Sequence, residues 1–195
     1  MTAQAQAQAH TQFVALADST AADWVLLTEA FTPFLADLPN RILAQMRALE
    51  HDHGGFPVNR LGHCLQTATR AYKDGRDEEY LVCALLHDIG DILAPAAHAD
   101  LAATILKPYV SPENHWMVEK HGIFQGYYFF HHIGLDRNMR EQFRGHDCFE
   151  QTAEFCAKYD GPSFDSAFES MPLDAFAPMV HNVLSAERLR RKGEA

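Results

Sequence analysis

The residues of this sequence that are best suited to chemistry are histidines and aspartates that follow apolar segments. His87 and Asp88 are adjacent and come directly after an apolar run at 80–86. Burying an imidazole beside a carboxylate is unfavourable by several kcal/mol unless the two groups pair or bind a metal ion. The pair therefore predicts either a hydrogen-bonded structural unit or part of a metal site, and on its own it supports both interpretations equally.

Four further residues strengthen the metal interpretation. His63 lies on an apolar stripe one predicted helix earlier, and two antiparallel helices joined by a short turn would bring it level with His87. His98 and His121 belong to later helical segments, and Asp160 ends another. Together with Asp88, these side chains suit two divalent or trivalent first-row ions, with a carboxylate bridging them. An incomplete ligand shell would leave positions for water, dioxygen or substrate.

The elements that must position these residues are predicted to be helices. Apolar spacing, capping residues and Gly or Pro breaks predict helices at about 20–33, 40–50, 59–72, 77–88, 98–107, 113–130, 136–143, 147–159 and 172–190. Because no Val/Ile/Thr alternation is long enough for a sheet, we expect an all-α fold. We expect one domain over residues 1–195, with a flexible Ala/Gln-rich tail at 1–12.

Composition excludes several classes of protein. The formal net charge is −10, from 16 basic and 26 acidic side chains, and this argues against nucleic-acid binding. The sequence has no apolar stretch long enough to span a membrane and no signal peptide at its start. Its four cysteines include no C-x-x-C pair. We therefore expect a cytoplasmic protein with reduced, structural cysteines.

The order of the six candidate ligands resembles the H…HD…H…H…D series of the HD-domain superfamily, over about residues 58–160. The matching residues are His63, His87, Asp88, His98, His121 and Asp160. The resemblance implies an all-α helical bundle with a dinuclear metal site between its central helices. It also implies that the spare histidines His131 and His132 lie outside the ligand shell. Most members of the superfamily are phosphohydrolases acting on nucleotides or other phosphate esters, and a smaller branch contains mixed-valent di-iron oxygenases.

Local sequence favours the oxygenase branch, which includes myo-inositol oxygenase and phosphonate-cleaving enzymes. Segment 61–68 around the first histidine is similar to the corresponding helix of the phosphonate-cleaving enzymes, as is the separation of His98 and His121. The resemblance implies two iron ions, Fe(II) and Fe(III), with dioxygen as co-substrate. The implied reaction converts a 1-hydroxyalkylphosphonate into a carboxylate and phosphate.

Asp91 is where this sequence departs from its relatives. Many hydrolases and myo-inositol oxygenase carry Lys at this position, and the aminophosphonate enzyme carries His. A carboxylate there would repel a phosphate and attract a cationic substrate end. Tyr128 and its aromatic neighbours could offer ring faces to a quaternary ammonium, although each ring is more readily explained as core. These features point to (R)-1-hydroxy-2-(trimethylammonio)ethylphosphonate, which would give glycine betaine and phosphate.

Further substrate contacts follow from the same resemblance. Phosphonate oxygens need donors, and Lys158, Asn138 and Gln125 are the candidates, although relatives carry Lys at the position of Gln125. Three arginines are alternatives, each equally explained as part of a solvated basic face: Arg137, Arg140 and Arg144.

The loop at 51–57 precedes the first ligand helix. In the phosphonate-cleaving enzymes this region carries a lid over the open metal position, a role that His53 or Phe56 would have here. A polar surface turn is an equally supported interpretation of the same residues.

Two other functions remain open at the level of sequence. An HD-type phosphohydrolase acting on a nucleotide or small phosphate ester would use the same ligands without oxygen. A non-catalytic metal-stabilised binding protein would have a coordinatively saturated site.

Overall fold

The computed structural model describes residues 10–193 and confirms the all-α class, since this part of the chain contains no strand. The chain divides into two units, Met1–Leu38 and Pro39–Ala195. Most of the predicted tail at 1–12 falls on residues 1–9, which lie outside the described residues. None of the described helices combines the length and apolarity that crossing a membrane requires.

The first unit contains a short 3-10 helix, η1 (Leu16–Asp18), and the helix α1 (Ala21–Ala36). A capping box starts α1. The backbone N–H of Asp23 donates to the Thr20 hydroxyl, and the Asp23 carboxylate accepts from the Thr20 backbone at 2.8 Å. This local signal explains why the helix predicted from residue 20 begins there.

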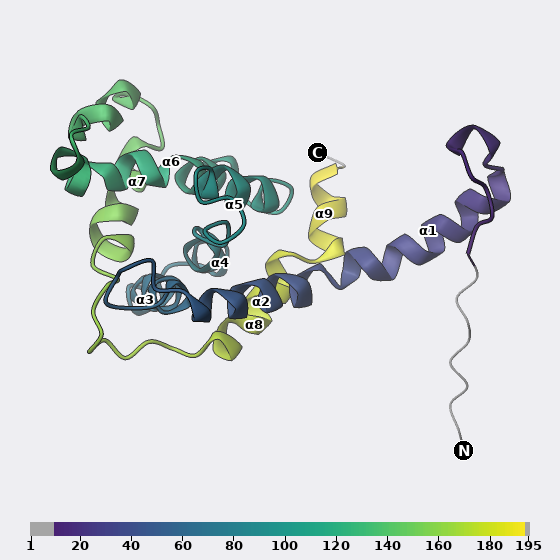
Figure 1. The fold of residues 1–195 in the computed structure, drawn as a ribbon, viewed down its shortest axis with the longest axis horizontal. Coiled ribbons are helices and arrows are strands. Elements are labelled where there is room, and N and C mark those ends of the chain that lie inside the picture. Colours follow the sequence, from purple (N-terminus) through teal and green to yellow (C-terminus); the bar gives the residue numbers. More distant parts are fainter. Residues whose placement is uncertain (1–9, 194–195) are drawn as a thin grey trace, which may run out of the picture. The chain divides into compact units, whose positions relative to one another are not determined.

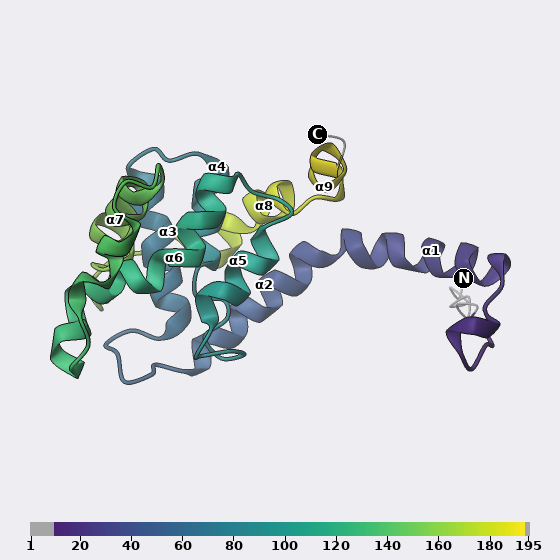
Figure 2. The same ribbon diagram turned by 90° about the horizontal axis from the view of Figure 1, so that it is seen from above.

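The second unit is a helical bundle (Figure 1). Its helices are α2 (Leu38–Ala48), α3 (Arg60–Lys73), α4 (Glu78–Leu86), α5 (His98–Leu106), α6 (Pro112–Phe129), α7 (Phe149–Phe155), α8 (Leu173–Val183) and α9 (Ala186–Gly193). The shorter turns are η2 (Leu49–His51), η3 (Phe130–Ile133), η4 (Arg137–Phe143) and the π-turn η5 (Cys156–Asp160). α4 packs against α3, α6 and α8, and α5 runs alongside α6 (Figure 2).

The starts of α3 and α4 are fixed by side-chain caps. The Gly62 N–H donates to the side chain of Asn59 at 2.7 Å at the start of α3, and the Tyr80 N–H donates to Asp77 at 2.9 Å at the start of α4. Every residue of α4 from Tyr80 onward is buried, as the apolar run predicts. α4 is therefore the centre of the core and ends immediately before His87.

Three predicted helices differ from the structure in form. The helix expected at 172–190 is two helices, because Ser185 interrupts it and accepts the backbone N–H of Arg188 at 3.2 Å as a new cap. The segment expected as a helix at 136–143 is the 3-10 helix η4. The helix expected at 147–159 changes to a π-turn at Cys156.

The π-turn depends on Gly161. Its backbone N–H donates to the Cys156 carbonyl at 2.8 Å, a bond that spans one residue more than an α-helical bond. A Cβ atom at Gly161 would lie 2.7 Å from the same carbonyl oxygen. Only glycine fits this close approach, and the turn places Asp160 against α3 in the core.

We predict that Gly161→Ala lowers the free energy of unfolding by about 1–3 kcal/mol, because the added methyl group must displace the Cys156 carbonyl. Urea unfolding followed by circular dichroism measures the change. Gly122→Ala is the matched control, since a Cβ there would meet only His98 Nε2, at an ordinary 3.9 Å. A Gly161→Ala protein as stable as wild type would contradict the account of the π-turn.

Candidate metal centre

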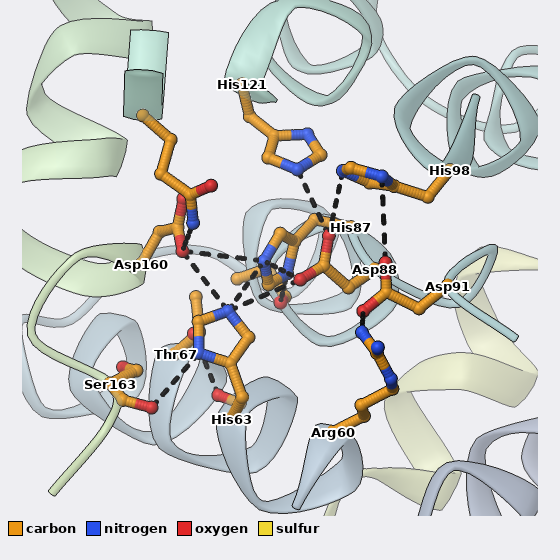
Figure 3. A network of polar contacts seen from close by, with 12 residues as sticks. Arg60, His63, Thr67, His87, Asp88, Asp91, His98, His121, Asp160 and Ser163 are labelled. Atoms are coloured by element: carbon orange, nitrogen blue, oxygen red, sulfur yellow. Dashed lines mark hydrogen bonds and ion pairs between the residues drawn. The ribbon is translucent and has the colours of Figure 1, made fainter. Parts of the chain in front are cut away.

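Six side chains from five segments converge at one end of α4 (Figure 3). They are His63 of α3, His87 and Asp88 after α4, His98 of α5, His121 of α6 and Asp160 of η5. Five of them are buried, and His98 is partly exposed. The structure therefore brings together all the ligands that the sequence predicts.

Asp88 lies between two groups of imidazoles. Its Oδ2 atom is 3.4 Å from His63 Nε2 and 3.3 Å from His87 Nε2. Its Oδ1 atom is 3.1 Å from His121 Nε2 and 3.5 Å from His98 Nε2. One carboxylate oxygen thus faces each group, which is the arrangement of a carboxylate that bridges two ions.

The first group of ligands contains His63 and His87, and Asp160 completes it. Its Oδ1 atom is 3.1 Å from His63 Nε2 and 3.7 Å from His87 Nε2, and the two Nε2 atoms are 3.1 Å apart. Ligand atoms bound about 2.1 Å from a common ion lie roughly 3.0–3.4 Å from one another. The other oxygen of Asp160, Oδ2, is buried without a hydrogen-bond partner. The residues present therefore fit a bound cation.

Backbone carbonyls fix the orientation of the buried imidazoles. Each ring donates from Nδ1, which leaves the lone pair of Nε2 directed into the cluster. The pairs are His63 with Ser163 at 3.0 Å, His87 with Ala84 at 2.9 Å and His121 with Val118 at 2.7 Å. This tautomer is the one that metal binding through Nε2 requires.

Charges within the cluster shift the pKa values of several of its members. Burial alone would raise the pKa of Asp160, but its contacts with His63 and His87 hold that pKa well below the usual range. Burial likewise opposes ionisation of Asp88, and His87 and His121 outweigh it, so the pKa is again lowered. The pKa of His87 is raised, because the two aspartates outweigh its burial. The lowered pKa values favour the anionic form of both carboxylates, which is the form that binds a metal ion.

The second group consists of Asp88, His98 and His121, and two of these residues line a cavity. A Cβ atom at Gly90 would lie 2.7 Å from the His98 carbonyl oxygen, so the turn after Asp88 packs directly on the start of α5. This contact holds His98 opposite His121. Asp88 and His98 line a cavity of about 220 Å³, and a bound ion here would keep coordination positions open to it.

Asp91 also lines this cavity, and its carboxylate is already paired. Its Oδ2 atom accepts from Arg60 Nη1, and its Oδ1 atom is 3.6 Å from His98 Nδ1. The same guanidinium donates from Nε to Asp52 at 2.6 Å. The negative charge that the sequence suggested for a cationic substrate end is therefore compensated by Arg60.

The other predicted substrate contacts separate into two sets. Gln125 lines the cavity and donates to Asp160 Oδ1 at 2.8 Å, and Tyr128 lines an adjoining cavity. Lys158 and Asn138 line neither. The Lys158 ammonium is largely exposed and pairs with Glu154 one helical turn away, and the Asn138 backbone is held by Asp136. Predicted contacts of Lys158 and Asn138 with a phosphonate gain no support from this geometry.

The predicted lid residues lie at the cavity of about 220 Å³ beside the metal ligands, which we call the metal-side cavity. His53 and Phe56 both line it. The Phe56 ring stacks on Phe164 with ring centroids 4.9 Å apart, and Phe164 stacks on His63 at 4.4 Å. The 51–57 loop is thus in contact with the cluster through two aromatic rings, as a covering segment requires, and its movement stays a prediction.

Sequence reasoning missed Arg60 and Phe164. Arg60 could have been found, because it lies three residues before His63 and so shares its helix face. Phe164 belongs to an irregular segment after the π-turn and carries no such signal. The spare histidines His131 and His132 are exposed and outside the cluster, as expected.

Comparison with known proteins agrees with this geometry. Residues 60–142 match the HD domain family. The matched segment contains five of the six clustered ligands, and Asp160 follows it. No curated protein matches the chain. The match supports a metal-dependent site of the HD type without selecting a reaction.

We predict two metal ions per chain, with unequal dependence on the ligands. Asp88→Ala should lose both ions, because each group loses a carboxylate oxygen, whereas His121→Ala should retain the ion of the first group. Metal analysis of purified protein measures the stoichiometry. His132→Ala, an exposed histidine outside the cluster, is the control and should keep both ions. Equal metal loss from Asp88→Ala and His121→Ala would refute the bridging role.

Proposed function

We propose that this protein is a di-iron oxygenase that uses dioxygen to cleave the C–P bond of a 1-hydroxyalkylphosphonate. The observation that carries the proposal is the asymmetry of the centre. Four ligands, His63, His87, Asp88 and Asp160, surround the first position, whereas only Asp88, His98 and His121 surround the second. Asp88 and His98, together with His63 of the first group, line a small cavity that also contains the Arg60 guanidinium. Such a site can receive a chelating, anionic substrate and a second small molecule.

The size of the cavity and the local sequence favour this branch over nucleotide hydrolysis. A volume of about 220 Å³ is below the roughly 300–1,000 Å³ of typical ligand pockets, so the polar head that it receives must be small. A hydroxyl-bearing carbon with its phosphonate group meets this limit. The similarity of segment 61–68 to phosphonate-cleaving enzymes supports the same choice. (R)-1-Hydroxy-2-(trimethylammonio)ethylphosphonate, which the resemblance implies, is the first compound to test.

The reaction balances without an external reductant. One 1-hydroxyalkylphosphonate and one dioxygen give one carboxylate and one phosphate, and the carbon of the C–P bond supplies the electrons that dioxygen accepts. A bound Fe(II)/Fe(III) pair would supply dioxygen activation. The protein residues bind and orient the substrate and limit the access of water.

Arg60 is suited to hold the phosphonate. Its planar guanidinium offers N–H donors that match phosphonate oxygens, and the contacts with Asp52 and Asp91 restrict its orientation. The stacked rings of Phe56 and Phe164 cover His63 on the cavity side. These contacts support the proposal, because they would hold a substrate head beside the open group and limit its contact with solvent.

Phosphate-ester hydrolysis is the second candidate function. The same two ligand groups with Mn(II) or Co(II) would position a water molecule and polarise a phosphoryl oxygen. The small cavity favours a compact ester over a nucleotide in this case. A protein with neither activity would instead be a metal-stabilised binding protein.

We expect protein loaded with Fe(II) and ascorbate to release phosphate from 1-hydroxyalkylphosphonates in air, with one phosphate for each dioxygen consumed. An oxygen electrode and a phosphate assay measure the two quantities. The same mixture under nitrogen should release no phosphate. Phosphate release from esters with Mn(II) or Co(II) under nitrogen, and none from any phosphonate in air, would select the hydrolase instead.

We predict that Arg60→Gln raises KM for the phosphonate by about tenfold to a hundredfold, because it removes a charge-assisted contact with the substrate head. Iron content should stay unchanged, since Arg60 is not a ligand. Arg47→Gln is the matched control, because Arg47 pairs with Asp174 on the surface, with both side chains exposed. An unchanged KM for Arg60→Gln would exclude Arg60 from substrate binding.

A further inference from the structure

A second cavity adjoins the metal-side cavity and differs from it in character. We call it the tail cavity. Its volume is about 580 Å³, and aromatic rings form much of its wall. The residues that carry the argument are Phe56, Tyr128, Phe129, Ala157 and Phe164. None of the described residues that line it has an ionised side chain, since burial keeps the pKa of the Cys156 thiol well above its usual value.

The two cavities share part of their walls. Phe56, Gln125 and Phe164 line both of them. The hydrogen bond from Gln125 to Asp160 holds this boundary beside the metal ligands. A molecule whose polar head lies at the open ligand group therefore has its opposite end directed toward the tail cavity.

The charges around the tail cavity favour a neutral occupant. No carboxylate lines it among the described residues. The Arg140 guanidinium, which opposes the rise that burial causes in the pKa of Tyr128, covers the Tyr127 ring at 3.6 Å and lies 3.6 Å from the Glu141 carboxylate. An alkyl or aryl group in the tail cavity would be stabilised by leaving water, whereas a cation would find no carboxylate in the described lining to pair with.

The volume also favours a large end group. About 580 Å³ lies within the range of pockets that hold drug-sized ligands, roughly 300–1,000 Å³. A single small group such as trimethylammonium would leave much of this space to water. An extended alkyl chain or an aryl ring would contact the four aromatic rings.

We infer that the tail cavity binds an uncharged alkyl or aryl end of the substrate, while the phosphonate head lies at the metal centre. This inference rests on the proposed function for the identity of the head. It assigns to the protein a class of longer, apolar 1-hydroxyalkylphosphonates and replaces the small trimethylammonium compound as the best substrate.

The first experiment measures binding without turnover. Methylphosphonate, butylphosphonate and hexylphosphonate lack the 1-hydroxyl group, and calorimetric titration of the metal-loaded protein gives their Kd values. We expect Kd to fall by about threefold for each methylene group that enters the cavity. A Kd that does not change with chain length overturns the inference.

A pair of variants localises the effect. Ala157→Phe fills the tail cavity and should weaken hexylphosphonate at least about tenfold more than methylphosphonate. Ala167→Phe, the same change at an exposed position that lines neither cavity, should preserve the wild-type ratio of the two Kd values. Circular dichroism checks that both variants fold. If the ratio of the hexylphosphonate Kd to the methylphosphonate Kd is the same in the two variants, the assignment is overturned. The chain-length series on the wild-type protein tests the inference independently of either variant.

An isosteric pair separates apolar from cationic recognition. 1-Hydroxy-3,3-dimethylbutylphosphonate has the shape of the trimethylammonium candidate but carries no positive charge. We expect the neutral compound to have the higher kcat/KM, and a preference for the cationic compound overturns the inference. If no phosphonate releases phosphate but Kd still falls with chain length, the proposed reaction fails and the tail cavity stands.

Discussion

The carboxylate of Asp88 is the contact on which the arrangement of the centre depends. Its two oxygens face two pairs of imidazoles, so α3, α4, α5 and α6 must all end or pass within reach of one residue. Burying this anion is unfavourable unless the surrounding groups compensate its charge. The helices of the bundle must therefore pack so that their ligands reach Asp88. The helix α4 meets this requirement by ending directly before His87.

The two sides of the centre have different surroundings. The first group is enclosed by Asp160 and the packed core, and its residues are buried. Asp88 and His98 of the second group line the cavity that contains Arg60 and Asp91, and this cavity shares Phe56, Gln125 and Phe164 with a second one lined largely by aromatic rings. We infer from this contrast that one set of residues determines reactivity and another determines which substrate binds. The ligands determine the chemistry at the head, and residues remote from them determine which molecules reach it.

Sequence was sufficient for the features that local patterns determine. The helix caps, the buried run of α4 and the six ligands follow from residue types and spacing. The prediction of Lys158 and Asn138 as donors rests on their place in the chain. The turns that carry them direct the Lys158 side chain outward and leave Asn138 outside both cavities. The tail cavity is formed by residues of α6, η5, the segment that follows η5 and the 51–57 loop, an arrangement that no local pattern encodes.

The π-turn makes the centre sensitive to the length of the chain before it. η5 accommodates one more residue in its turn than an α-helix would. Removing a single residue from α7 would allow regular α-helical pairing and rotate Asp160 by about 100° around the helix axis. Helix content would barely change, yet the first group would lose its enclosing carboxylate. We therefore expect the centre to tolerate substitutions in α7 better than insertions or deletions there.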